Sequence, residues 1–149
     1  MYSEFNAWIF LNHVPDLGPM RFRELLQCAG TACGILELSV SGLVAAGASP
    51  ELAERWWKEF RSADIARAVD EELRRIASGE FQAVTEIDAG YPESLKELPD
   101  RPFVLYVKGQ WPLPKAWAIG VVGTRRASPY GSHPPPGGSR PIVRRTAPS

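Results

Sequence analysis

Cysteine and histidine are scarce in this sequence, and neither sign of charge is in excess. The 149 residues include two cysteines and two histidines, and 17 basic residues balance 17 acidic ones. Cys28 and Cys33 lie in an apolar stretch, far in sequence from His13 and His133, so we expect two reduced core thiols and no metal or cofactor site. The zero net charge excludes a global basic field that would attract nucleic acid.

Long apolar runs are also absent. No run approaches the roughly 20 residues of a membrane span, and the N-terminus has no signal-peptide pattern. We therefore expect a cytoplasmic protein without membrane contact. Residues 1–131 hold 14 basic against 17 acidic residues, whereas residues 132–149 contain three arginines and no acid. The prolines and glycines of that last segment predict a disordered basic tail.

Helical periodicity and helix punctuation are present throughout residues 3–78. Pro19 and Pro50 stand where helices should begin, and Ser49 is placed as an N-cap. In the most regular stretch, Glu71 is placed to pair with Arg75. We expect Trp8, Trp117 and one of Trp56 and Trp57 in the core. The predicted inward residues of the second helix are Met20, Phe22, Leu25 and Leu26.

A Pro-x-x-Gly turn separates the first two predicted helices. Pro15 and Gly18 define this turn, which is the centre of the helix-hairpin-helix motif that grips DNA phosphate through backbone amides. Asp16 stands where the DNA-gripping form has glycine, and its carboxylate would repel phosphate. We therefore interpret the turn as a helix-packing hairpin.

The period changes to that of strands after residue 79. Residues 81–88 and 103–109 are short and rich in β-branched and aromatic residues, with a small helix predicted between them. Residues 116–123 form a third, almost wholly apolar stretch, typical of the centre of a parallel sheet. The pattern predicts the start of an α/β domain.

A glycine-arginine turn follows the third predicted strand. Gly123 lets the backbone turn, Ser128 can cap a helix, and free amides at such a turn favour an anion. An arginine there offers the paired donors that suit phosphate. A turn with solvated arginines is the alternative. The predicted DNA phosphate-binding residues are Gly123, Thr124, Arg125, Arg126 and Ser128. No catalytic constellation accompanies them, so we expect no enzyme.

Several motifs in joint order resemble the DNA-processing protein A family (DprA, also called Smf), over roughly residues 5–131. The helical region is similar to that family's N-terminal domain, of helix-hairpin-helix or SAM-like type. The matching positions are Tyr91-Pro92, Leu95, Pro102, Val104-Leu105-Tyr106, Lys108-Gly109, Gly123-Thr124-Arg125, Ser128 and Tyr130-Gly131.

The resemblance implies an extended Rossmann-like fold that binds single-stranded DNA and delivers it to the recombinase RecA in natural transformation. By that analogy the glycine-arginine loop contacts phosphate, with Arg125 as the lead residue. We therefore expect an α+β to α/β chain. A helical domain (residues 1–79) is followed by the first strands of an incomplete Rossmann-like parallel sheet (80–131) and the disordered tail (132–149).

The family continues after Tyr130-Gly131 with an amphipathic helix, whereas this sequence has three consecutive prolines. Proline inside a helix costs about 3 kcal/mol. Our hypothesis is a truncated or out-of-frame end that lacks the family's dimer surface and binds DNA weakly or not at all; a natural short form is the alternative. Two further function classes stay open: a fragment of a nucleotide-binding Rossmann-type enzyme, and a small helical interaction module.

Overall fold

The computed structural model describes residues 2–112 and 142–144. Within them, six helices precede the first strand, which agrees with the helical periodicity of residues 3–78. Their bounds are α1 Glu4–Asn12, α2 Pro19–Ala29, α3 Ala32–Glu37, α4 Val40–Ala45, α5 Pro50–Glu59 and α6 Ala63–Ala77.

Side-chain caps and prolines set where these helices begin. Pro19 and Pro50 are the first residues of α2 and α5, as predicted. The first turn of a helix leaves its backbone amides without partners, and proline has no amide hydrogen to leave unpaired. Serine or threonine hydroxyls accept from a backbone amide in the first turn of the other helices and of α5. The capping residues are Ser3, Thr31, Ser39, Ser49 and Ser62.

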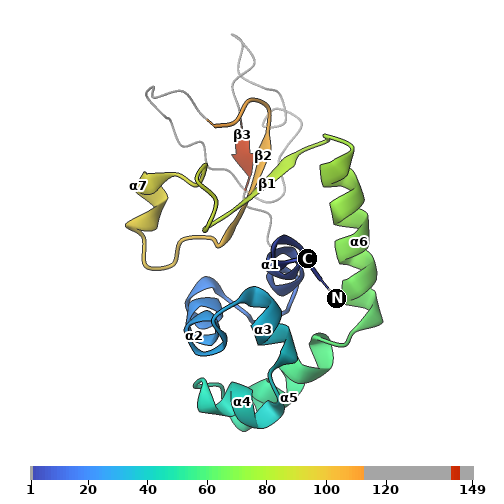
Figure 1. Ribbon diagram of the computed structural model, residues 1–149, viewed down its shortest axis with the longest axis vertical. Coiled ribbons are helices and arrows are strands. Elements are labelled where there is room, and N and C mark those ends of the chain that lie inside the picture. Colours follow the sequence, from blue (N-terminus) through green and yellow to red (C-terminus); the bar gives the residue numbers. More distant parts are fainter. Residues whose placement is uncertain (1, 113–141, 145–149) are drawn as a thin grey trace, which may run out of the picture.

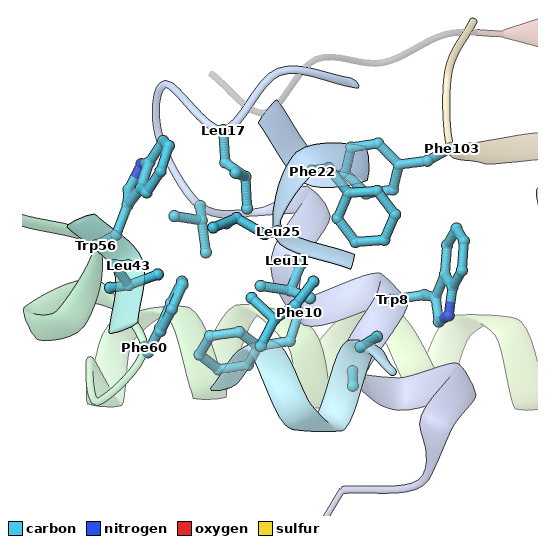
Figure 2. Packing of buried hydrophobic residues seen from close by; sticks show 14 of the residues in the cluster. Trp8, Phe10, Leu11, Leu17, Phe22, Leu25, Leu43, Trp56, Phe60 and Phe103 are labelled. Atoms are coloured by element: carbon cyan, nitrogen blue, oxygen red, sulfur yellow. The ribbon is translucent and has the colours of Figure 1, made fainter. Parts of the chain in front are cut away.

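The helices enclose one hydrophobic core, which also reaches the sheet. In Figure 1, α2 to α5 lie in the lower part of the molecule, α1 lies between them and the strands, and α6 runs along one side up to the strands. Figure 2 shows Phe22 and Phe103 side by side, with Trp8 beside them. The rings of Phe22 and Phe103 are stacked with centroids 4.0 Å apart, and Trp8 meets Phe22 edge-on at 4.7 Å. Phe103 thus joins the segment before the second strand to the helical core.

The sheet is antiparallel, which corrects the predicted parallel pairing of its first two strands. β1 (Gln82–Thr85) pairs with β2 (Val104–Lys108), and β2 pairs with β3 (Ile142–Arg144). A parallel pair needs a crossover that carries the chain back along the sheet, usually through a helix of some length. The connection between β1 and β2 contains only the four-residue helix α7 (Glu93–Lys96), so the chain reverses direction instead.

The two faces of β2 belong to two different clusters. Val104 and Tyr106 pack against the helical core, whereas Leu105 and Val107 belong to a second apolar cluster on the other face. This alternation follows from the two-residue period of a strand. The second cluster is completed by Val84, Tyr91, Leu95 and Trp111.

Three predictions about single residues in the helices are wrong. Met20 is exposed rather than inward, because it lies at the start of α2 beyond the contacts that bury Phe22 and Leu25. The two thiols were predicted to lie in the core, whereas Cys28 is exposed and Cys33 is half-buried. Glu71 pairs with Arg74, because the guanidinium of Arg75 bonds Glu80 just beyond the helix.

Other predictions for the helical part are confirmed. Trp8 and Trp56 are fully buried, and Trp57 is the half-buried member of its pair. The third predicted strand (residues 116–123) and Trp117 lie outside the described residues. Of the predicted tail, the structure describes only Ile142–Arg144, as the strand β3.

Candidate nucleic-acid interface

The predicted phosphate-binding loop begins at Gly123, with ten residues between it and the described range that ends at residue 112. Its residues, Gly123, Thr124, Arg125, Arg126 and Ser128, lie outside the described residues. What the structure places is the framework that precedes the loop: β1, β2 and the connection between them. The matching Tyr-Pro and Leu-Tyr motifs of the sequence also lie in this framework.

Two local contacts fix the beginning of the connection. Asp88 turns its carboxylate back to the end of β1, where Oδ2 accepts from the backbone amide of Thr85 at 2.6 Å and from its hydroxyl at 2.8 Å. The amide of Tyr91 then donates to the carbonyl of Asp88 at 2.9 Å. The turn after β1 is therefore closed by its own side chains.

Tyr91 ties the beginning of the connection to its end. The side chain is buried, and its hydroxyl donates to the carbonyl of Pro102 at 2.5 Å. Burial, followed by the charge of Glu86, raises the pKa of Tyr91, so the phenol stays protonated and remains a donor. Pro92 next to it is the N-cap residue of α7. The Tyr-Pro motif is thus a structural anchor for the connection.

A cluster of two arginines around one carboxylate, here called the Arg23 clasp, holds this connection against α2. Nε and Nη2 of Arg23 donate to Oε2 of Glu86 at 3.1 and 3.0 Å, and Nε of Arg101 donates to Oε1 of the same carboxylate at 2.8 Å. Arg23 also donates to the carbonyls of Pro19, Pro99 and Arg101. Every donor group of its guanidinium is thereby used inside the protein.

A second polar network joins β2 to α1 and α6. The Tyr106 hydroxyl donates to Oε1 of Glu72 at 2.6 Å and accepts from the side-chain amide of Asn12 at 3.0 Å. Oε2 of Glu72 lies 2.7 Å from Nε2 of His13. Burial and the Glu72 carboxylate raise the pKa of Tyr106, which keeps the phenol neutral. The Leu-Tyr motif therefore fastens β2 to the helices.

The arginines of residues 2–112 all have partners within the protein. Arg61 lies over the ring of Trp57 at 3.9 Å from its centroid. Each of the others makes an ion pair with an Asp or Glu carboxylate. These are Arg21, Arg23, Arg55, Arg67, Arg74, Arg75 and Arg101. Residues 2–112 thus offer phosphate no arginine that is free of an intramolecular contact.

The Pro-x-x-Gly turn packs against α5. The carbonyl of Pro15 accepts from the indole of Trp56 at 3.1 Å, and Asp16 lies 3.0 Å from Arg55. Asp16 has a φ of 61°, the left-handed conformation that aspartate tolerates better than most residues. These contacts support the interpretation as a helix-packing hairpin; a DNA-gripping helix-hairpin-helix is not confirmed.

Residues 2–112 contain no group of three or more His, Cys, Asp or Glu side chains that could hold a metal ion. No helix among the residues that the structure describes has the length and apolar character to cross a membrane. The carboxylates of Glu86 and Asp88, which alternate at the end of the first strand, are both occupied by structural hydrogen bonds.

The sequence did not point to Arg23 or to Glu72 as network residues. Apart from Pro19, the partners of Arg23 lie 63 to 78 positions away, and those of Glu72 lie 34 and 59 positions away. The sequence contains only part of the signal. A charged side chain on the inward side of a helix requires a partner, but the sequence does not show which residue that partner is.

Comparisons with known proteins agree with this framework. The family model described as DNA recombination-mediator protein A matches residues 82–135, a range that begins with β1, includes α7 and β2 and contains the predicted glycine-arginine loop. No curated protein and no solved structure matches the chain. Residues 82–135 are therefore similar to the DNA recombination-mediator protein A family, the DNA-processing family whose motifs the sequence resembles.

Proposed function

We propose that this chain binds single-stranded DNA through the loop of Gly123, Thr124, Arg125, Arg126 and Ser128, within a role in DNA processing and recombination. The affinity should be weak, because three prolines follow where the family has the helix behind the loop. The observation that carries the proposal is the family match over residues 82–135, which contains the whole loop. Arginine forks and free backbone amides at one turn suit the phosphate groups of a nucleic acid backbone.

The distribution of arginine partners supports this location. The arginines of residues 2–112 are engaged with carboxylates or with Trp57, and acidic residues outnumber basic ones in residues 1–131. An attraction between DNA phosphate and this part of the chain would have to break those contacts. The loop carries two adjacent arginines with no acidic residue between Gly109 and Ser149 to compete for them.

The recombinase RecA is the proposed recipient of the bound strand, by the family relationship. A cytoplasmic location follows from the same proposal, because recombination takes place on chromosomal DNA. The chemistry asked of the chain is binding and transfer, for which no bond needs to be made or broken.

Salt-dependent binding of a fluorescent single-stranded oligonucleotide tests the phosphate contact. For single strands each phosphate contact adds about 0.7 to the magnitude of the negative slope of log K against the logarithm of the salt concentration. The double variant Arg125→Ala with Arg126→Ala should therefore reduce that magnitude by about 1.4. The matched control is Arg67→Ala with Arg74→Ala, which removes two exposed arginines of α6 that pair with carboxylates. A slope that the loop variant leaves unchanged, or that the control lowers equally, contradicts the proposal.

Filament assembly tests the transfer step separately. RecA nucleates slowly on a strand covered by single-strand binding protein, and the full chain should shorten that lag. The loop variant should not shorten it. A lag that the chain does not change, at concentrations where it binds the oligonucleotide, removes RecA from the proposal and leaves DNA binding standing.

A further inference from the structure

Charge is distributed very unevenly along this chain, although the total is zero. All 17 acidic residues lie within residues 1–100, together with nine of the 17 basic residues. Residues 101–149 hold the other eight basic residues and no acidic one, so the two parts carry formal charges of −8 and +8. A strong charge asymmetry between parts of a chain is typical of proteins whose basic part binds nucleic acid.

The strand β3 brings the basic end of the chain back to the sheet. Lys108, the last residue of β2, pairs with Ile142, and Tyr106 pairs with Arg144. Figure 1 shows β3 beside β2 in the upper part of the molecule. The chain therefore leaves the sheet after Lys108 and returns to it beside the same residue, with the glycine-arginine loop between these two points of the sequence.

Lys108 is an exposed lysine at the end of β2, and it makes no ion pair among residues 2–112. Its charge acts on one carboxylate, that of Glu80. The pKa of Glu80 is lowered first by its hydrogen bond to Arg75, at 2.6 Å, and to a smaller extent by the charge of Lys108. Because Arg75 already holds that carboxylate, the Lys108 ammonium can serve as a point charge for an anion from outside.

Arg144 lies on the strand that runs beside Lys108. Two residues of a strand span about 7 Å, so the backbone of Arg144 lies about that far along β3 from Ile142, the partner of Lys108. One more arginine, Arg145, follows in the sequence, and no carboxylate side chain does. The pairing of β2 with β3 thus puts two basic positions on one edge of the sheet, at the point where the chain departs towards the loop.

We propose that Lys108 and Arg144, here called the basic edge, bind backbone phosphates of the single-stranded DNA that the glycine-arginine loop holds. This inference rests on the proposed function and extends its site from the loop to the sheet. Phosphate contacts carry no sequence information, so the basic edge adds affinity without a preference for particular bases. The end of the chain takes part in binding because β3 holds it beside β2.

Binding of a fluorescein-labelled oligothymidylate to the full chain, over a series of salt concentrations, tests the basic edge. Lys108→Gln with Arg144→Gln removes two phosphate contacts and should reduce the magnitude of the salt slope by about 1.4. The matched control, Lys58→Gln with Arg67→Gln, removes the same charge from α5 and α6 and should leave the slope unchanged. If circular dichroism shows the double variant unfolded, Arg144→Gln alone should reduce the magnitude by about 0.7.

A second variant tests the strand pairing without changing any charge. Val143→Pro places a residue that has no amide hydrogen in the middle of β3, which disfavours pairing with β2. It should weaken binding about as much as Arg144→Gln does, because the arginine is then no longer held at the sheet. Thr146→Pro, which lies outside the strand, is the control and should leave the affinity unchanged.

The outcomes separate this inference from the proposed function. A slope that Arg125→Ala with Arg126→Ala reduces, but that the basic-edge variant leaves unchanged, overturns the basic edge and leaves the loop standing. Equal effects of the basic-edge variant and its control also overturn it, as does a Val143→Pro protein that binds like the parent. A slope that only the basic-edge variant reduces contradicts the proposed role of the loop instead. Absence of oligonucleotide binding by the parent chain contradicts both.

Discussion

The carboxylate of Glu86 offers the sharpest test of how the strands are attached to the helices. Glu86→Gln keeps the size of the side chain but replaces one oxygen that accepts from an arginine with an amide group that faces it. Arg23 and Arg101 then remain close to each other without a negative charge between them. Because Arg23 comes from α2 and Arg101 from the segment before β2, the substitution acts on the contact between the two parts of the chain.

The size of the effect follows from burial. An exposed ion pair contributes about 0–1 kcal/mol, whereas removing one partner of a buried pair costs about 3–5 kcal/mol. The exposed fractions of the Arg23 and Glu86 side chains are 18% and 16%, so this half-buried pair lies between the two cases. The retained carbonyl oxygen of glutamine still accepts one hydrogen bond. We therefore expect the free energy of unfolding to fall by about 2 kcal/mol, and Tm by about 4–8 °C.

Urea unfolding followed by tryptophan fluorescence and by far-UV circular dichroism measures this loss. Glu71→Gln is the matched control, because its ion pair with Arg74 is exposed, and it should cost at most about 0.5 kcal/mol. Adding Arg101→Gln to Glu86→Gln should cost less than the sum of the two single substitutions by about 1 kcal/mol, since it removes an unpaired charge. A loss from Glu86→Gln no larger than that of the control would refute the reasoning.

Two further predictions concern the helical core. Glu4 accepts from the amides of Ala32 and Cys33 at the start of α3; burial acts to raise the pKa of Glu4, but these hydrogen bonds together hold it below its ordinary value of 4.5. Glu4→Gln should therefore lower the free energy of unfolding by about 1–2 kcal/mol at any pH above 4.5, and this difference should disappear as pH falls through the lowered pKa. Urea unfolding of both proteins over a series from pH 7 downward measures it. Phe103→Ala should cost about 3–5 kcal/mol by urea unfolding, because it removes the ring stacked on Phe22; a loss under about 1 kcal/mol would show that the strands contribute little to the helical core.

Local chemistry accounts for the part of the fold that could be predicted. Pro19, Ser49 and Pro50 mark helix starts by rules that involve only their neighbours, and the structure begins α2 and α5 at those prolines. The strands β1 and β2 were also predictable, since β-branched and aromatic residues are concentrated over a few positions. For each of these features the determining atoms lie within a few residues of one another.

The pairing of the strands and the position of Met20 depend on distant residues. A short apolar strand is compatible with parallel or antiparallel neighbours, and the outcome is decided by how the chain between Glu86 and Phe103 is anchored. Tyr91 anchors the connection through the carbonyl of Pro102, 11 positions away. Arg23 anchors it through Glu86 and the carbonyl of Arg101, 63 and 78 positions away. Met20 fits the helical stripe by spacing, but it is exposed at the first turn of α2, where no helix or strand within residues 2–112 buries it. For the candidate site, the sequence predicts which residues bind phosphate. The loop lies outside the described residues, so its geometry stays a prediction.

The alternating faces of β2 limit how the gene can change in length. Val104 and Tyr106 face the helices, while Leu105 and Val107 face the second cluster. A codon gained or lost between Pro102 and Lys108 would exchange these two sets and send every apolar side chain to the wrong neighbour. Length variation in related sequences should therefore be rare between Pro102 and Lys108.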